Sequence, residues 1–180
     1  MMLSEIFEIE YSREVDELID AFTRMVKWWI EKAGDRVWER YDRLRTAFYK
    51  DWTAEFSGWS TQLAHSSALE AHSRLRLGKP PSERAVAAEL DLPIAVLHPK
   101  MIKVENHCLR VYMRRGVGYV YIRLKPANRI QSTLLEQAEK RLWKIGQVTL
   151  SRRWAIIPFV MDGIDSKRLK IIEELLKASG

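Results

Sequence analysis

The sequence of 180 residues has one cysteine, Cys108, and lacks any long run of apolar residues. A single cysteine cannot form an internal disulfide framework, and such scarcity is typical of a reducing compartment. The longest nearly uncharged apolar stretch, residues 154–161, is far too short to cross a bilayer. Acidic residues interrupt the N-terminal end, so no signal peptide is indicated. These absences favour a cytoplasmic protein without a membrane partner.

The sequence also lacks a recognisable catalytic or metal-binding constellation. His65 and His72 stand on one face of a predicted helix, but no cysteine or carboxylate joins them at a ligand spacing. Asp162 and Asp165 lack the further acidic residues that a two-metal nuclease site needs. The sequence therefore predicts no metal, no cofactor and no enzymatic activity for this chain.

Charge is distributed unevenly along the chain, whose formal net charge is +6. Residues 100–153 contain thirteen lysines and arginines against three acidic residues, whereas residues 1–20 contain seven acidic residues and one arginine. Such a basic segment is typical of a surface that neutralises phosphates. RNA, with DNA as a further contact, is the partner that this pattern favours. The alternative is a basic sheet face that contacts only water.

Helical spacing of apolar residues dominates the first part of the chain. Ser12 is the expected N-cap of a first helix, which ends at Gly34. A second helix is expected over residues 37–56, with Val37 in its apolar stripe. A third helix is expected over residues 60–77, and the small residues on its inward face predict the close approach of another helix.

Strand-like alternation appears at the N-terminal end, where the apolar Ile6 has acidic neighbours, and again after position 101. Strands are expected over residues 3–11, 102–104, 109–113, 119–124, 148–150 and 153–159, and helices over 82–90, 132–144 and 166–177. An isolated strand leaves its backbone groups unpaired, so the first strand is expected to join the later sheet.

These elements predict an α+β fold, in which a helical insertion interrupts a small antiparallel β-barrel or sheet and a short C-terminal helix follows. The β-rich domain comprises residues 1–11 and 94–161, the helical insertion residues 12–93, and the C-terminal helix residues 162–180. Residues 78–81, Gly-Lys-Pro-Pro, are a candidate boundary within the insertion.

Basic residues alternate with apolar ones along the predicted strands, so one face of the sheet is expected to be cationic and the other buried. Tyr112, Tyr119 and Tyr121 lie between the cations and can stack on bases or riboses. The expected nucleic-acid-binding residues are Lys100, Lys103, Arg110, Tyr112, Arg114, Arg115, Tyr121, Arg123, Lys125, Lys144, Arg152 and Arg153.

Two other functional classes stay open. Residues 38–59 hold seven large aromatic side chains, and an exposed tryptophan among them would favour a protein–protein interaction subunit. A DNA-binding transcription regulator is the other class, since residues 81–93 resemble the first helix and turn of a helix-turn-helix. Pro93 and Pro99 break the segment where its recognition helix should follow, because proline inside a helix costs about 3 kcal/mol.

The order of the segments resembles the N-terminal half of the OrfB/TnpB-type proteins of transposons, compact RNA-guided DNA nucleases related to type V CRISPR effectors. The resemblance rests on residues 11–29, the serine-containing helix that ends at residues 78–80, the hairpin 101–124, and the segments 143–150 and 154–159. In that family this region is a wedge β-barrel with a helical recognition insertion, which holds the guide RNA and its heteroduplex.

The resemblance implies a wedge-like domain that binds structured RNA or an RNA–DNA hybrid. The RuvC-like nuclease domain of the family, with three magnesium-binding carboxylates, and its zinc-binding cysteines have no counterpart in this sequence. The resemblance therefore implies either a recognition module that binds without cutting or one half of a split RNA-guided nuclease, whose second chain carries the RuvC-like domain.

Overall fold

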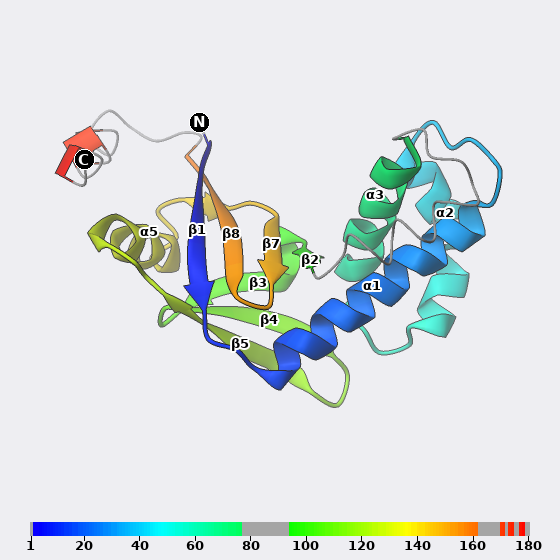
Figure 1. Cartoon of the computed structure of the whole chain (residues 1–180), viewed down its shortest axis with the longest axis horizontal. Helices are drawn as coiled ribbons and strands as arrows, with labels where there is room; N and C mark the ends of the chain where they lie inside the picture. Colours follow the sequence, from blue (N-terminus) through cyan, green and yellow to red (C-terminus); the bar gives the residue numbers. More distant parts are fainter. Residues whose placement is uncertain (1, 77–93, 162–169, 172, 175–176, 179–180) are drawn as a thin grey trace.

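The computed structural model describes residues 2–76, 94–161, 170–171, 173–174 and 177–178. Within these residues the chain is α+β, with four α-helices and an eight-stranded antiparallel sheet that curls on itself (Figure 1). None of the helices among these residues is long and apolar enough to span a membrane.

Several sequence-based expectations concern segments outside this part of the chain, wholly or in part; one is the helix-turn-helix resemblance of residues 81–93, which lies outside the described residues. The candidate boundary at residues 78–81, the helix expected over 82–90 and the acidic pair Asp162 and Asp165 lie outside the described residues. The helix expected over 166–177 is described only at five positions, residues 170, 171, 173, 174 and 177, and all five are helical.

The helices are α1 (Arg13–Ala33), α2 (Tyr41–Glu55), α3 (Gln62–Arg76) and α5 (Arg129–Glu139), with a short 3-10 helix, η1 (Pro99–Met101). The strands are β1 (Met2–Ile9), β2 (Ile94–Leu97), β3 (Ile102–Glu105), β4 (Cys108–Arg114), β5 (Gly118–Lys125), β6 (Lys144–Ile145), β7 (Val148–Ser151) and β8 (Trp154–Val160). Helices α1 to α3 lie at one end of the sheet and α5 at the other (Figure 1).

Strand β1 occupies the middle of the sheet, whose order is β2-β7-β8-β1-β5-β4-β3. It pairs with β8 from Met2 to Glu8 and with β5 at its other end, so the expectation that the first strand joins the later sheet is confirmed. The buried side chains of β1 are Phe7 and Ile9, whereas Ile6 is 61% exposed. The alternation around Ile6 thus predicted the strand correctly but did not indicate which of its faces is buried.

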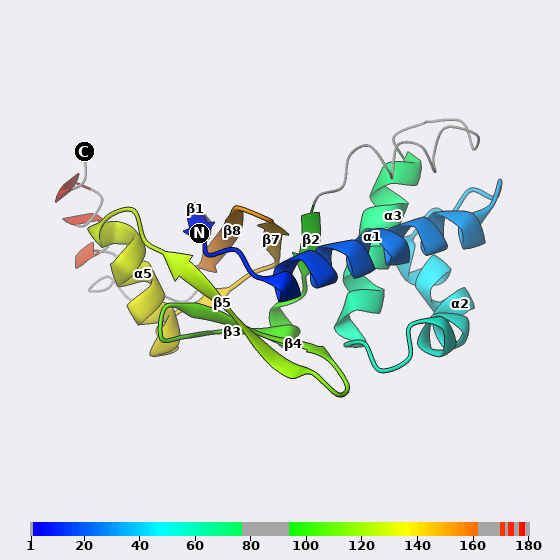
Figure 2. The same ribbon diagram turned by 60° about the horizontal axis from the view of Figure 1, so that its bottom comes forward.

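The two strands at the ends of this order, β2 and β3, are neighbours in the sequence. Only residues 98–101, which include η1, separate them. A link this short brings the two ends of the sheet close together, so the sheet has to curl. Figure 2 shows β1, β8 and β7 on one side of the curl and β3, β4 and β5 on the other.

Helix α1 agrees closely with its prediction. The Ser12 hydroxyl accepts a hydrogen bond from the Val15 backbone N–H at 3.3 Å, and Gly34 ends the helix with φ of 57°. On the buried face, the Trp29 indole N–H donates to the Ser67 hydroxyl of α3 at 2.9 Å. The buried residues of α1 include Val15, Leu18, Phe22, Met25, Val26, Trp29 and Ala33, and those of α3 include Leu63, Ala64, Ala68 and Ala71. The small residues of α3 allow the close contact of the two helices that the sequence predicts.

Helix α2 begins later than predicted, at Tyr41. The expectation that Val37 lies in its apolar stripe is wrong, because Val37 is 82% exposed in the preceding loop. Trp38 packs instead. Its indole donates to the Ala33 carbonyl at 3.2 Å, and its own carbonyl lies 2.6 Å from Nε2 of His72.

Helix α5 begins and ends earlier than predicted. Asn128 accepts a hydrogen bond from the Gln131 backbone N–H at 2.9 Å and caps the helix, which begins at Arg129, three residues before the expected start. The helix ends at Glu139, and Arg141 adopts a left-handed φ of 59° that an α-helix cannot contain. Residues 144–145 form β6 instead of a last helical turn, because they pair with the far end of β8.

Candidate nucleic-acid interface

The outward face of β3, β4 and β5 carries the predicted cations and tyrosines. Burial alternates along all three strands, with apolar residues inside and polar ones outside. Lys103, Arg110 and Tyr121 stand in register across the three strands, since Lys103 pairs with Arg110 and Arg110 with Tyr121. A row of two cations and a 57% exposed tyrosine therefore crosses this face.

A concave surface adjoins this row. It consists of two depressions, of about 440 and 380 Å³, that share Lys100, Ile102, Lys103 and Arg141 in their linings. We call the two together the basic groove. Its polar and aromatic lining residues are Lys100, Lys103, Arg110, Tyr112, Tyr119, Arg141, Trp143 and Lys144. Among the described residues, no carboxylate lines either depression, so the groove has five cations and no opposite charge in its wall.

Arg110 is held at the wall of the groove by a cation–π contact with an aromatic ring. Its guanidinium carbon lies 3.9 Å from the centroid of the Tyr119 ring, and Tyr119 meets Tyr112 edge-to-face at 5.5 Å. Nη1 of Arg110 also lies 3.5 Å from Glu105 at the rim. Nε of Arg110 is buried without a hydrogen-bond partner in the part of the chain that the structure describes, so the donors open to an anion are those on Nη1 and Nη2 that Glu105 does not engage.

The opposite wall comes from the segment after α5. Trp143 is buried and its indole N–H donates to the Leu134 carbonyl at 3.4 Å, which fixes the chain between Arg141 and Lys144. Both of these cations are exposed. Within the described residues, neither they nor Lys100 and Lys103 form an ion pair.

Arg141 was missed as a site residue. The predicted helix ran to Lys144 and so placed Arg141 on an ordinary helix face. The only local signal was the alternation of Trp143, Lys144 and Ile145 before Gly146, which is too short to predict a strand by itself.

Other predicted cations lie near the same strands but are paired with carboxylates of the N-terminal segment. Arg123 lies 3.9 Å from Glu10, and Lys125 lies 3.9 Å from Glu8. Arg114, at the end of β4, binds a carboxylate of α1 at 2.7 Å. The acidic first part of the sequence thus folds beside the basic strands and offsets part of their charge, so these three cations do not line the groove.

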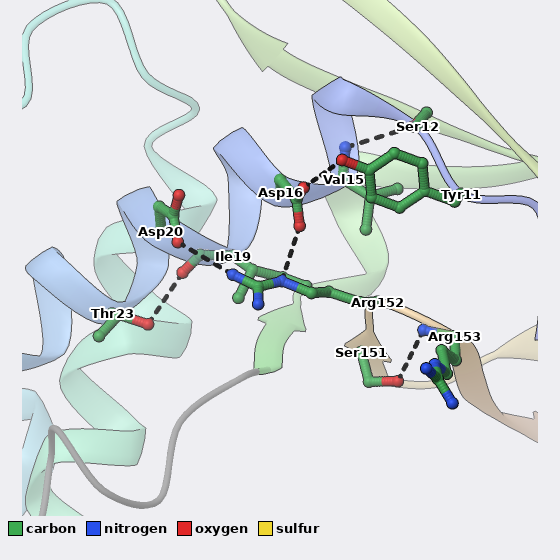
Figure 3. A network of polar contacts seen from close by, with 10 residues as sticks. All are labelled: Tyr11, Ser12, Val15, Asp16, Ile19, Asp20, Thr23, Ser151, Arg152 and Arg153. Carbon is green, nitrogen blue, oxygen red and sulfur yellow. Dashed lines mark hydrogen bonds and ion pairs between the residues drawn. The ribbon is translucent and has the colours of Figure 1, made fainter.

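Arg152 faces helix α1, away from the groove. Its Nε lies 2.7 Å from Asp16 and its Nη2 lies 3.6 Å from Asp20 (Figure 3). Tyr11 donates to the other Asp16 oxygen at 2.6 Å, and this hydrogen bond raises the pKa of the Tyr11 hydroxyl. Arg153 is exposed on the same β7–β8 turn, where its backbone N–H donates to Ser151 at 3.2 Å. The structure does not bring these two arginines to the groove.

The histidines and the cysteine occupy separate places. His65 lies 3.3 Å from the Tyr41 hydroxyl and meets the His98 ring at 4.9 Å. Cys108 is a half-buried free thiol on β4, and burial raises its pKa. Among the described residues, no three histidine, cysteine, aspartate or glutamate side chains are grouped so that they could hold a metal ion.

The aromatic residues of the helices offer little exposed surface for protein docking. Trp52 is 1% exposed, and Trp38 and Trp59 are half-buried. Tyr49 is the most exposed aromatic residue on α2, at 37%. An interaction subunit was expected to present a tryptophan as an exposed anchor, and none of these three is fully exposed.

Comparison with known proteins gives no further identification. No protein-family model matches the chain, and no curated protein matches it.

Proposed function

We propose that this chain binds nucleic acid through the basic groove, with structured RNA or an RNA–DNA hybrid as the preferred ligand. The observation that carries the proposal is the lining of the groove, where five cations gather without a carboxylate. Like charges that converge in one concavity repel each other, and an anionic ligand offsets this repulsion. A chain of phosphates supplies negative charge at the regular spacing that several separated cations can neutralise.

The aromatic residues favour nucleic acid over a simple polyanion. Tyr112 and Tyr119 line the groove, and Tyr121, in register with Arg110, is exposed beside it. Bases and riboses stack on such rings, and stacking of this kind is worth about 1–3 kcal/mol per base. Most contacts would go to phosphates, so we expect the protein to recognise backbone geometry more than base sequence.

The resemblance to OrfB/TnpB-type proteins supports the same ligand. Under this proposal the curled sheet is a wedge-like domain, and the helices between β1 and β2 are its recognition insertion. The chain would act as a recognition module that does not itself cut nucleic acid. A second chain with a RuvC-like domain would supply any cleavage.

A pair of charge-matched variants tests the proposal. Lys103→Gln with Arg141→Gln removes one lysine and one arginine from the groove, whereas Arg123→Gln with Lys125→Gln removes the same charges from the carboxylate-paired set. Fluorescence anisotropy with a labelled RNA hairpin should show at least a tenfold loss of affinity for the first variant and less than about threefold for the second. Equal losses of affinity in both variants would mean that the net charge of the protein, and not the position of the cations, determines binding. That result would contradict a role for the groove.

A further inference from the structure

A second depression lies where the helices meet the β4–β5 hairpin. It has a volume of about 620 Å³, and its lining includes Glu17 and Arg24 of α1, Gly58 and Trp59 of the α2–α3 loop, and Arg114 and Arg115 of the hairpin. We call it the Trp59 pocket. Pockets that hold small ligands have volumes of about 300–1,000 Å³, so this one is large enough for a nucleotide.

The pocket has unpaired positive charge beside an aromatic ring. Glu17 is engaged by Arg114, which leaves the guanidiniums of Arg24 and Arg115 without an ion pair among the described residues. Trp59 is half-buried, so part of its ring is open to solvent. The Arg114 guanidinium lies 5.6 Å from the centroid of that ring. An indole and two free cations are the groups that bind an aromatic base and a phosphate.

The backbone holds these groups in place. Arg115 donates its backbone N–H to the Gly58 carbonyl at 2.7 Å, and Ser60 donates to the Met113 carbonyl at 3.1 Å. Gly58 has φ of 88°, and a Cβ built there would lie 3.4 Å from Cβ of Arg115. That distance is an ordinary van der Waals contact, so it is the positive φ, and not the space, that favours glycine at this position.

A neighbouring depression of about 390 Å³ shares lining residues with both this pocket and the basic groove. It shares Gly58, Trp59 and Arg115 with the Trp59 pocket and extends to Tyr112, which also lines the groove. Tyr112 is thus the residue at which the two surfaces meet. A strand bound in the groove would reach the pocket by passing this ring.

We infer that the Trp59 pocket holds one unstacked nucleotide of the bound nucleic acid, with its base against the Trp59 indole and its phosphate between Arg24 and Arg115. The inference rests on the proposed function for the strand that leads into the pocket. Under this inference the ligand must carry a single-stranded nucleotide beside its structured part. A groove that binds only the sugar–phosphate backbone would not require that nucleotide. A free mononucleotide offers the same chemistry.

A double-mutant cycle between protein and RNA tests the position of the base. The probe is an RNA hairpin with a short single-stranded overhang, made complete and with an abasic nucleotide at each overhang position in turn. Removing the correct base should lower the affinity of the natural protein about five- to a hundredfold. Trp59→Leu should lower the affinity for the complete RNA similarly and show no additional loss with the abasic RNA. Independent, multiplicative losses would overturn the inference.

A second variant keeps the test independent of the folding of Trp59→Leu. Arg24→Gln with Arg115→Gln removes both free cations of the pocket and should weaken binding at least tenfold. Arg13→Gln with Arg129→Gln, a pair of exposed arginines outside the pocket, is the charge-matched control and should change affinity less than about threefold. Equal effects of the two variants would overturn the inference.

Two further comparisons separate the inference from the proposed function. Lys103→Gln with Arg141→Gln could weaken binding of both the complete and the abasic RNA while the pocket variants leave binding unchanged. That result would support the groove as the binding site and contradict the nucleotide site in the Trp59 pocket. Alternatively, AMP could bind the natural protein but not the Arg24→Gln, Arg115→Gln variant while neither protein binds RNA. That result would support a nucleotide site in the Trp59 pocket and contradict nucleic-acid binding in the groove. If ribose 5-phosphate competes for the pocket as well as AMP does, the pocket binds the phosphate alone. That result would contradict the proposed contact between the base and Trp59.

Discussion

Nη2 of Arg114 lies 2.7 Å from Oε1 of Glu17, and Nε of the same arginine donates to that oxygen at 3.2 Å. The two residues are 97 positions apart, one at the end of β4 and the other in the first turns of α1. The pair joins the hairpin to the helix and neutralises a cation that the sequence assigns to nucleic-acid binding. Proximity to other cations along the chain is therefore a poor measure of the charge available to a ligand.

Glu17→Gln should release Arg114 and raise the affinity for RNA by a few-fold. The stability cost should be below about 1 kcal/mol, because both side chains are more than one-third exposed and water screens such pairs. Anisotropy measurements and urea unfolding give the two values. Glu14→Gln removes one negative charge from the same helix at an exposed position and is the control. A similar gain in that control would mean that net charge, and not the freed arginine, is responsible.

The salt dependence of binding should count the phosphates that the groove neutralises. Five groove cations predict a log–log slope between about −3.5 and −4.5, depending on whether the contacted backbone is single- or double-stranded. Lys103→Gln with Arg141→Gln should reduce the magnitude of this slope by about 1.4–1.8. Affinity measured over a series of potassium chloride concentrations checks both numbers. If the two substitutions leave the slope unchanged, the phosphates are bound by residues outside the groove.

The hydrogen bond from Trp29 to Ser67 should contribute to stability because it lies between two buried helix faces. Ser67→Ala leaves the indole N–H without its acceptor and should destabilise the fold by about 1–3 kcal/mol in urea unfolding. Ser73→Ala, at an exposed position on the same helix, should change stability little or raise it slightly, because alanine has the higher helix propensity. Two variants of equal stability would show that the indole finds another partner.

His65 and His98 should make the fold sensitive to acid. Burial lowers the pKa of both histidines, and for His65 the neighbouring His98 lowers it further. Their folded-state pKa values lie below the ordinary value of about 6.5, so the unfolded chain takes up protons first as the pH falls. The stability that depends on these neutral rings is complete above about pH 6.5 and is lost as the pH falls toward the folded-state pKa values.

Urea unfolding between about pH 7.5 and pH 5 measures this loss. The double variant His65→Gln with His98→Gln should lose less stability over that interval than the natural protein does. The same pH dependence in both proteins would assign the effect to other groups.

A helix could be predicted from the sequence where its capping residues and its buried face are determined by residues close together in the sequence. Ser12 and Gly34 bound α1 because a hydroxyl cap and a left-handed glycine act within one turn. The hairpin from β3 to β5 also followed from local alternation and from turns in which Asn106 and His107 have positive φ.

Tertiary contacts decided the remainder. Strand β2 was missed because the short run Ile94 to Leu97 between two prolines has no period of its own, and it becomes a strand by pairing with β7. Helix α2 was predicted too long because nothing local shows that Trp38, and not Val37, would pack. The ion pairs of Arg114 and Arg152 with α1 depend on how the chain folds back, which charge counts along a sequence do not contain.

The central place of β1 has a consequence for how the protein is made. Its long partner, β8, is synthesised almost 150 residues later, so β1 emerges from the ribosome and then waits for most of the chain. Helices α1 to α3 need no such delay, since their mutual contacts are complete by residue 76. We expect the helices to form while translation continues and the sheet to close only after its last strand appears, as distant strand pairing is intrinsically slow.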